Sequence, residues 1–193
     1  MIIMYQKYHT EALVLGSREQ GETDRSVALY THEFGLVWAR AAAARTDRSK
    51  MRYALTHYSH CHVSLIRGKN GWRIAGAAAG MTAVDKQEVG VRAFARAAQL
   101  VMRLVAGAEQ NTYLFEALAD GHAALLEADA SLVPSIELVC VARVLYALGY
   151  LSPAAVGSAM FAHTAYAPDM LASDEERDVL LVSINRALAE THL

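Results

Sequence analysis

The hydrophobic pattern changes its period near residue 80, and this change restricts the chain to a fold built in two parts. Before residue 80, short runs of β-branched, aromatic and small residues alternate with turn sequences, as in half-buried strands. From about residue 84, apolar residues recur at spacings of three and four, as along one face of a helix. The pattern predicts an α+β protein with domains at residues 1–80 and 81–193.

The N-terminal part contains five candidate strands. The Gly-containing sequences HEFG and RGKNG predict hairpins, whereas the charged RTDRSKMR predicts a longer loop. Five short strands joined mostly as hairpins fit a small closed barrel of the OB type better than a sandwich, which usually needs about seven strands. We therefore expect a five-stranded OB-fold barrel. The candidate strands cover residues 10–17, 26–31, 36–43, 53–66 and 72–79.

The C-terminal part is predicted to be an all-α helical domain. Helical spacing runs through residues 91–105, 112–127 and 134–148. The segment 134–148 is so apolar all round that we expect it to be the central buried helix, ended by Gly149.

Two shorter signals extend the helical domain towards residue 191. Pro153 predicts the start of a short helix near 153–162, because proline is favoured at the first helical position. Ser173 and Glu176 have the spacing of a capping box, in which the two side chains satisfy each other's backbone N–H groups. They predict the start of a last helix.

The two parts carry opposite charge, although the formal net charge is only −2. Residues 1–80 hold 11 Lys and Arg against 6 Asp and Glu, whereas residues 81–193 hold 7 against 14. A basic surface raises the local concentration of phosphate and steers its encounter. The N-terminal barrel is therefore the candidate module for a polyanion, with chance solvation of a charged surface as the alternative.

The sequence THYSHCHVSL holds three histidines and a cysteine, which are zinc-ligand types. On a strand His60 and His62 share one face, whereas Cys61 lies on the other. No CxxC, HExxH or HxxxH spacing is present to complete a site. We expect no metal and no cofactor; a half-site of His60 and His62 with His32 or His57 is the alternative.

Cysteine usage and hydropathy point to the cytoplasm. Cys61 and Cys140 lie 79 positions apart, and in a reducing compartment such a pair is more often two buried thiols than a disulfide. The N-terminal MIIMYQK lacks the basic and apolar regions of a signal peptide, and no long uncharged apolar run is present. We expect a cytoplasmic protein without a membrane span.

A family resemblance appears in GETDRSVALYTHEFGLVWARAAAARTDRSKMRYAL, at residues 21–55. With TEALVLGSREQ before it and HVSLIRGKNGWRI after it, the stretch resembles the N-terminal OB domain of the recombination mediator family RecO. LVMRLVAGAEQNTYLFEAL and ELVCVARVLYALGYL look like the helical domain of the same family. The resemblance covers residues 8 to about 152, and it rests on the order of the motifs.

The resemblance implies a non-catalytic DNA repair protein of the bacterial cytoplasm, associated with the nucleoid. RecO-like proteins bind single- and double-stranded DNA and anneal complementary strands. They act with the partner RecR in loading the RecA recombinase during homologous recombination. Their helical domain receives the acidic C-terminal tail of single-stranded-DNA-binding protein.

Basic residues on the third strand, the loop after it and the last hairpin are the candidate DNA-binding residues. If these residues line one barrel face, they neutralise phosphates of two DNA strands at once. This neutralisation reduces the repulsion between the two backbones, which opposes annealing. Tyr58 and Trp72 are candidates for base stacking, with a place in the barrel core as the alternative. The candidate DNA-binding residues are Arg40, Arg45, Arg48, Lys50, Arg52, Arg67, Lys69 and Arg73.

A second basic stripe, formed by Arg92, Arg96 and Arg103, follows one helix face in the acidic half. A solvated helix surface explains such a stripe. The alternative is that its guanidinium groups pair with carboxylates of the partner's tail beside an apolar groove.

The chain departs from the family pattern in two places. Where the family usually has a Lys-Gly pair, this sequence reads Ala42-Ala43, which removes one phosphate contact and puts a stiffer residue in a flexible position. Arg40, about 7 Å away on the same strand face, is the candidate substitute. Many relatives also carry a four-cysteine zinc finger after the helix matching 134–148, but LGYLSPAAVGSAMF contains no cysteine.

The motif GETDR is expected to organise a turn. Glu22, Asp24 and Arg25 are placed for local hydrogen bonds and an ion pair, because short acidic side chains bond to nearby backbone N–H groups. Direct contact of Arg25 with DNA is the alternative.

Two other classes of function fit parts of the sequence. A hydrolytic centre of His57, His60 and His62 with Asp24 would lack a nucleophile motif, a phosphate loop and complete metal spacing. An OB-fold RNA-binding or protein-interaction module without a repair role fits the barrel equally well. Strand pairing activity would distinguish a RecO-like protein from that module.

Overall fold

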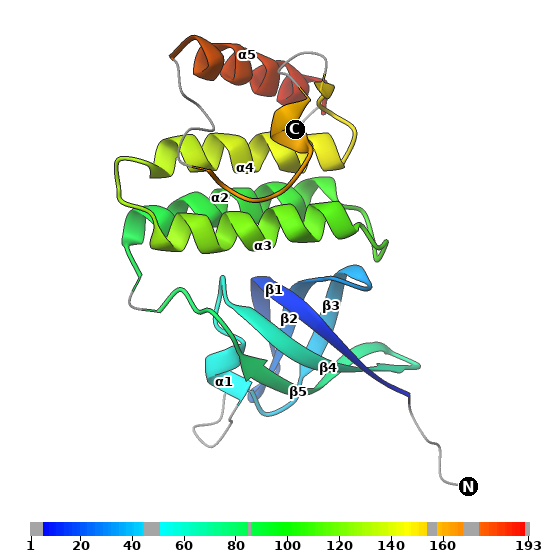
Figure 1. The fold of residues 1–193 in the computed structure, drawn as a ribbon. Coiled ribbons are helices and arrows are strands. Elements are labelled where there is room, and N and C mark those ends of the chain that lie inside the picture. Colours follow the sequence, from blue (N-terminus) through cyan, green and yellow to red (C-terminus); the bar gives the residue numbers. More distant parts are fainter. Residues whose placement is uncertain (1–5, 45–50, 85, 154–157, 168–173, 192–193) are drawn as a thin grey trace, which may run out of the picture. The chain divides into compact units, whose positions relative to one another are not determined.

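The structure is a computed structural model that describes residues 6–44, 51–84, 86–153, 158–167 and 174–191. The chain divides into two compact units. One unit holds the strands, and the other holds the long helices (Figure 1). The segment Ala106–Gln110 groups with the strand unit.

Five strands form a closed barrel in the order β1-β2-β3-β5-β4. Neighbouring strands are antiparallel except for β3 and β5, which close the barrel as a parallel pair. The expected OB-fold barrel, followed by helices, is confirmed. The strands are β1 (Lys7–Gln20), β2 (Asp24–Thr31), β3 (Gly35–Ala41), β4 (His60–Gly68) and β5 (Gly71–Ala79).

Strand β1 closes the barrel because it pairs with two partners. Its first part, from Lys7 to Leu13, pairs with β4, and its second part, from Ala12 onward, pairs with β2. The register shifts between Val14 and Gly16, where an extra residue bends the strand. The bend carries one continuous strand from one neighbour to the other.

The barrel interior is filled by small and branched apolar side chains. Val63 and Leu65 of β4 point inward with Cys61, whereas His62 is exposed on the outer surface. The alternation expected for this strand is therefore confirmed. Burial raises the pKa of the Cys61 thiol to about 12, so it stays protonated at neutral pH. Cys61 and Cys140 are both free and buried.

The strand expected at 53–66 is wrong in its first half. Met51–Ala54 forms the short helix α1, and β4 begins at His60. Tyr58 has a φ of 61°, and its N–H donates to the Val14 carbonyl oxygen at 2.8 Å. A left-handed residue interrupts a strand, so the chain turns onto β1 at this point.

The described residues of the second unit include four long helices. Helix α4 packs against α2, α3 and α5 and lies between them in Figure 1, so the expected central helix is confirmed. Its side chains Val139, Cys140, Val144 and Leu145 are almost fully buried. The helices are α2 (Glu88–Leu104), α3 (Thr112–Glu127), α4 (Val133–Ala147) and α5 (Asp174–Glu190).

Helix α4 ends where the sequence predicts. Gly149 has a φ of 79°, a conformation that glycine adopts without strain. Its N–H donates to the Tyr146 carbonyl oxygen at 3.0 Å, and the N–H of Tyr150 donates to Leu145 at 2.8 Å. These two bonds satisfy carbonyl groups that the end of the helix leaves without intrahelical donors.

The last part of the chain differs from expectation. Where a helix was expected near 153–162, the described residues instead form the 3-10 turn η2 (Ala159–Phe161), and Pro153 also has 3-10 conformation. Helix α5 begins at Asp174, and the proposed cap residue Ser173 lies outside the described residues. Among the described helices, none combines the length and the apolar character that crossing a bilayer requires.

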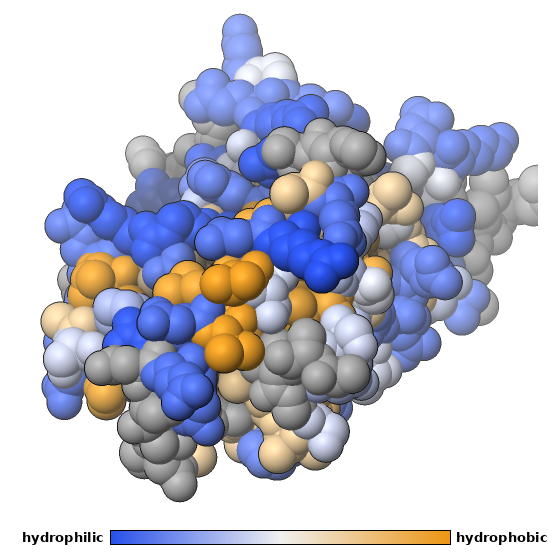
Figure 2. All heavy atoms as spheres, turned by 90° about the horizontal axis from the view of Figure 1, so that it is seen from above, coloured by the Kyte–Doolittle hydropathy of each residue, from blue (hydrophilic) through white to orange (hydrophobic). Residues whose placement is uncertain are grey.

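Helix α5 leaves apolar side chains on the surface. Val179, Leu181 and Val182 are all more than one-third exposed. Figure 2 looks down on the side where Figure 1 draws α5, and it shows apolar residues among hydrophilic ones. A groove of about 370 Å³ follows this helix. Its lining includes Tyr150, Leu151, Val182, Arg186, Ala187 and Glu190.

A buried arginine ties the segment after α4 to the helices. Arg143 is fully buried, and its guanidinium donates to the carbonyl oxygens of Met160 at 3.1 Å, Thr164 at 2.5 Å and Ala165 at 3.1 Å. It also lies 4.6 Å from the centre of the Tyr166 ring. Buried charge is tolerated only where hydrogen bonds replace water, and these three carbonyl groups supply them.

We predict that Arg143→Met lowers the free energy of unfolding by about 3 kcal/mol, because three carbonyl groups lose a charged donor. Arg103→Met is the control, since Arg103 lies exposed on α2, and we expect a change within about 0.5 kcal/mol. Urea unfolding followed by circular dichroism measures both. Equal stability of the two variants would contradict the assigned role of Arg143.

Candidate nucleic-acid interface

Four outward side chains line up across four strands of the barrel. In the register of the sheet, Arg18 on β1 lies opposite Ser26 on β2, and Ser26 lies opposite Arg40 on β3. Arg40 in turn lies opposite Arg73 on β5. Because neighbouring strands lie about 4.8 Å apart, the row spans about 15 Å of backbone. We call Arg18, Ser26, Arg40 and Arg73 the basic row.

The basic row faces solvent because its strand neighbours face the core. Ala39 and Ala41, which flank Arg40, are fully buried, and all three arginines of the row are exposed. Alternation along each strand places the row on the outer surface of the barrel. Three guanidinium groups on one line can neutralise several phosphates of one backbone.

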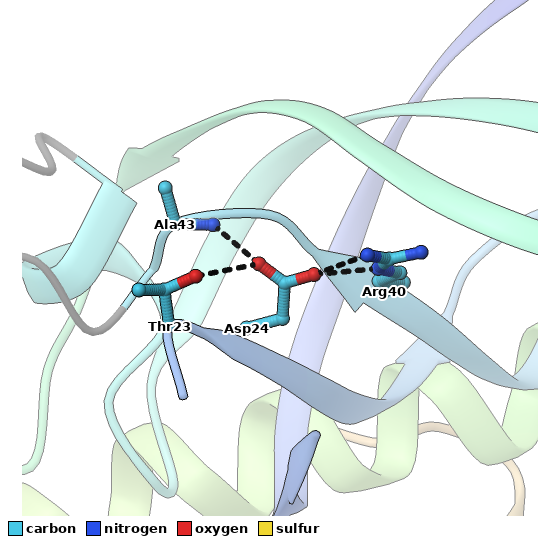
Figure 3. Close-up of polar contacts among 4 residues, drawn as sticks. All are labelled: Thr23, Asp24, Arg40 and Ala43. Atoms are coloured by element: carbon cyan, nitrogen blue, oxygen red, sulfur yellow. Dashed lines mark hydrogen bonds and ion pairs between the residues drawn. The ribbon is translucent and has the colours of Figure 1, made fainter. Parts of the chain in front are cut away.

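Asp24 holds the middle of the basic row in place (Figure 3). Its Oδ2 accepts from Nε of Arg40 at 2.7 Å and from Nη2 at 2.5 Å. Its Oδ1 accepts from the backbone N–H of Ala43 at 2.9 Å and from the Thr23 hydroxyl at 3.3 Å. The Ala43 N–H, followed by Arg40, lowers the pKa of the Asp24 carboxyl. A carboxylate held in this way is a poor general base.

The turn expected at GETDR therefore exists in a different form. Asp24 makes its ion pair with Arg40, 16 positions along the chain, rather than with the adjacent Arg25. The carboxylate joins the beginning of β2 to the end of β3. Two of the five N–H donors of Arg40 are used by Asp24, which leaves donors for a phosphate but offsets one positive charge of the basic row.

The Ala42-Ala43 departure falls on a strained turn. Ala43 has a φ of 51°, a left-handed conformation that costs an L-residue about 1–2 kcal/mol and suits glycine. The Lys-Gly pattern of the family would place glycine at this position. Asp24 stabilises the turn by accepting the Ala43 N–H.

Trp38 is an exposed aromatic residue beside the basic row. It lies two residues before Arg40 on β3, and 36% of its surface is accessible. The guanidinium carbon of Arg18 lies 4.5 Å from the centre of the indole ring. Trp38 and Arg18 therefore combine a flat aromatic surface with a positive charge.

The β4–β5 hairpin carries a second group of basic and aromatic residues. Arg67 and Lys69 are exposed, and the guanidinium of Arg67 lies 5.5 Å from the centre of the Trp72 ring. Trp72 is half-buried and packs against Tyr8 and Phe34, with ring centres at 5.7 and 5.0 Å. Most of its surface thus belongs to the end of the barrel core.

The comparisons with known proteins agree with this barrel. Residues 4–76 match the family described as "Recombination protein O N terminal". The N-terminal part of this chain is therefore similar to the N-terminal domain of RecO proteins, and we call its barrel the RecO-type barrel. Over 63 residues it is 36% identical to proteins named "DNA repair protein RecO" from two strains of Desulfitobacterium hafniense, DSM 10664 / DCB-2 and Y51. This alignment covers 33% of the chain and 23% of the length of each relative.

The other predicted DNA-binding residues fall into two groups. Arg45, Arg48 and Lys50 lie outside the described residues, so their place on the RecO-type barrel stays a prediction. Arg52 lies on α1, where its guanidinium donates to the Tyr53 hydroxyl at 3.1 Å. Tyr58, the other candidate for stacking, is half-buried at the turn before β4.

Arg18 and Trp38 were missed in the sequence. The expected first strand ended at residue 17, whereas β1 continues to Gln20 and brings Arg18 onto the sheet. Trp38 belongs to the sequence LVWARA, in which alternation places it on the same face as Arg40. Applying that alternation to the third strand would have found Trp38.

The histidines of the RecO-type barrel are distributed among separate contacts. Nε2 of His60 lies 3.2 Å from a carboxylate oxygen of Glu11, and Nε2 of His57 lies 2.7 Å from the Ser17 hydroxyl. Within the part of the chain that the structure describes, no group of three His, Cys, Asp or Glu side chains is placed to hold a metal ion. Burial, followed by the charge of Arg25, lowers the pKa of His57.

Two of the three arginines on α2 are paired within their own unit. Arg96 donates to both carboxylate oxygens of Glu137 at 2.6 and 2.7 Å, and Arg92 lies 2.5 Å from a carboxylate oxygen of Glu88. The ion pair with Glu137 raises the pKa of Arg96. Arg103 is exposed in the last turn of α2. The groove beside α5 is lined by other residues.

We predict that Ala43→Gly raises the free energy of unfolding by about 1 kcal/mol, because glycine adopts a positive φ without strain. Ala42→Gly is the matched control, since Ala42 is exposed in the same turn and its φ is not positive. There the added freedom of the unfolded chain lowers stability by about 0.4–1 kcal/mol. Urea unfolding distinguishes these opposite signs, and a loss of stability in Ala43→Gly would refute the strained turn.

The lowered pKa of Asp24 predicts a pH dependence. Because the folded pKa lies below the unfolded value of 3.8, the charged carboxylate stabilises the fold above that pH. This contribution is lost as the pH falls through the folded pKa. Unfolding experiments on the protein and Asp24→Asn should give a stability difference that is constant from about pH 7 to 5 and shrinks below about pH 4. Glu22→Gln, in the same turn, is the control; a difference that grows in acid would contradict the pairing.

Proposed function

We propose that this chain is a DNA repair protein that binds single- and double-stranded DNA through its RecO-type barrel and promotes annealing of complementary strands. In this proposal it acts without catalysing a reaction and without a cofactor. Its biological role is recombinase loading in homologous recombination, in the bacterial cytoplasm at the nucleoid.

The basic row carries the proposal. Its arginines come from β1, β3 and β5, so the register of the barrel, rather than a flexible loop, sets their spacing. Contacts to phosphate are independent of base sequence, which is what a protein that pairs any two complementary strands requires. Arg67 and Lys69 on the β4–β5 hairpin extend the positively charged surface, and we place the second DNA strand there.

Annealing follows from the same charges. Two DNA strands repel each other through their phosphates, and cations that bind both backbones lower that repulsion. Because phosphate contacts leave the base edges free, the strands remain able to pair while they are bound. The barrel thus acts by holding two backbones close together.

For the partners we propose RecR and the acidic C-terminal tail of single-stranded-DNA-binding protein. The α2 stripe is a weaker receiver of the tail than its charge suggests, because Arg92 and Arg96 already pair with carboxylates. The groove beside α5 combines apolar lining with Arg186, which suits an apolar peptide end with a carboxylate. Arg186 pairs with Glu190 at 3.2 Å and would exchange that partner on binding.

We predict that Arg40→Ala with Arg73→Ala weakens DNA binding at every sequence tested and lowers the salt dependence. For single strands the slope of log Kobs against log salt should fall by about 0.7 for each lost phosphate contact. Fluorescence anisotropy of labelled oligonucleotides between low and moderate salt measures the slope.

Arg92→Ala with Arg103→Ala is the matched control, because it removes the same charge from α2. Equal losses in the two double variants would mean that total charge, rather than the basic row, determines binding. The loop residues Arg45 and Lys50, which lie outside the described residues, are tested in the same way. The double variant Arg45→Ala, Lys50→Ala should also weaken DNA binding and lower the salt slope.

A strand-annealing assay tests the function itself. The full chain should accelerate pairing of complementary oligonucleotides, with and without single-stranded-DNA-binding protein, and the Arg40→Ala, Arg73→Ala variant should lose most of this acceleration. Equal binding to folded RNA and single-stranded DNA without any acceleration would favour an OB-fold RNA-binding or protein-interaction module instead.

A further inference from the structure

The surroundings of Trp38 differ from those of other aromatic side chains in the barrel. Trp72 lies among aromatic rings at the end of the core, and Tyr30 is almost fully buried. Trp38 lies on the outer face of β3, on the same side of the sheet as Tyr30, but keeps 36% of its surface accessible.

The residues paired with Trp38 across the sheet are small. Ala28 on β2 lies directly opposite it, and Gly16 on β1 lies opposite Ala28. Neither side chain extends beyond a methyl group, and Ala28 is itself fully buried. The next row of the sheet is the basic row, in which Arg18, Ser26 and Arg40 stand one step away. A flat ring thus lies beside a line of phosphate-binding groups.

Arg18 covers the ring in the absence of nucleic acid. Its guanidinium carbon lies 4.5 Å from the ring centre, within the range of a cation–π contact. Stacking of a base on an aromatic side chain is stronger than an exposed contact of this kind. A base can therefore take the place of the guanidinium, which is then released to a neighbouring phosphate.

We propose that Trp38 is a base-stacking platform for single-stranded nucleic acid, and that Arg18 leaves the ring to pair with the adjacent phosphate when a base stacks there. This inference rests on the proposed DNA binding by the barrel. It adds a selectivity that the basic row does not supply, because phosphates are present in single and double strands alike. In a duplex the bases are stacked on one another and are not accessible to Trp38.

The two tryptophans allow the platform to be observed directly. The chain contains two tryptophans, Trp38 and Trp72, so Trp72→Phe leaves Trp38 as the single tryptophan and Trp38→Phe leaves Trp72; selective excitation of tryptophan avoids the tyrosine signal. Each variant is titrated with a thymidine oligonucleotide, with the corresponding duplex and with inorganic polyphosphate, which has no bases. Anisotropy of labelled DNA measures binding in parallel.

We expect the oligonucleotide to quench Trp38 strongly and Trp72 weakly, and we expect polyphosphate to bind without comparable quenching of Trp38. Binding of the oligonucleotide with unchanged Trp38 fluorescence overturns the platform and leaves the proposed DNA binding intact. Equal quenching by polyphosphate also overturns it, because the effect would then come from charge. Absence of binding to any DNA overturns the proposed function and this inference together.

Affinity gives a second readout. Trp38→Ala should weaken binding of the thymidine oligonucleotide about tenfold, with a much smaller effect on the duplex and an unchanged salt slope. Trp38→Phe retains a ring and should keep most of the affinity, which protects the test against a folding defect in the alanine variant. Arg18→Ala should lower the salt slope for both ligands. Equal losses for single strand and duplex in Trp38→Ala would overturn the platform.

Discussion

Closure of the barrel depends on β1 pairing with β2 and β4 at once, and the bulge between Val14 and Gly16 makes this possible. Pairing in a sheet fixes which face each side chain occupies, since a slip of one residue exchanges the two faces. The register of β1, β2, β3 and β5 therefore aligns Arg18, Ser26 and Arg40. It also places alanine and valine in the interior. Core and surface are set by the same hydrogen bonds.

Asp24 links this surface to the turn that follows β3. One carboxylate orients Arg40 and also accepts the N–H of Ala43. The turn keeps a positive φ although it lacks glycine, so the carboxylate contributes stability where the backbone is strained. Removing its charge would affect both the fold and the position of Arg40. Stability and binding are thus coupled at this residue.

The sequence predicts the architecture well because hydrophobic period is a strong signal. It separates strands from helices, and alternation places Cys61 inside the barrel and His62 outside, as observed. It places Arg40 on a strand but cannot show that Arg73 is its neighbour, because the parallel pairing of β3 and β5 joins residues 33 positions apart. The conformation of Tyr58, which ends the expected strand early, is equally non-local, since its N–H bonds to β1. Arg143 lies within the apolar segment 134–148, and only tertiary packing reveals its three carbonyl partners.

The contacts of Arg143 have a consequence for how this chain tolerates change. Its three carbonyl partners contribute through main-chain oxygens, which every amino acid carries, whereas Tyr166 contributes through its ring. Substitutions at Met160, Thr164 or Ala165 therefore leave the acceptors in place, whereas the guanidinium has no equivalent among the other side chains. We therefore expect these three positions to tolerate many different residues, provided that Arg143 on α4 is kept.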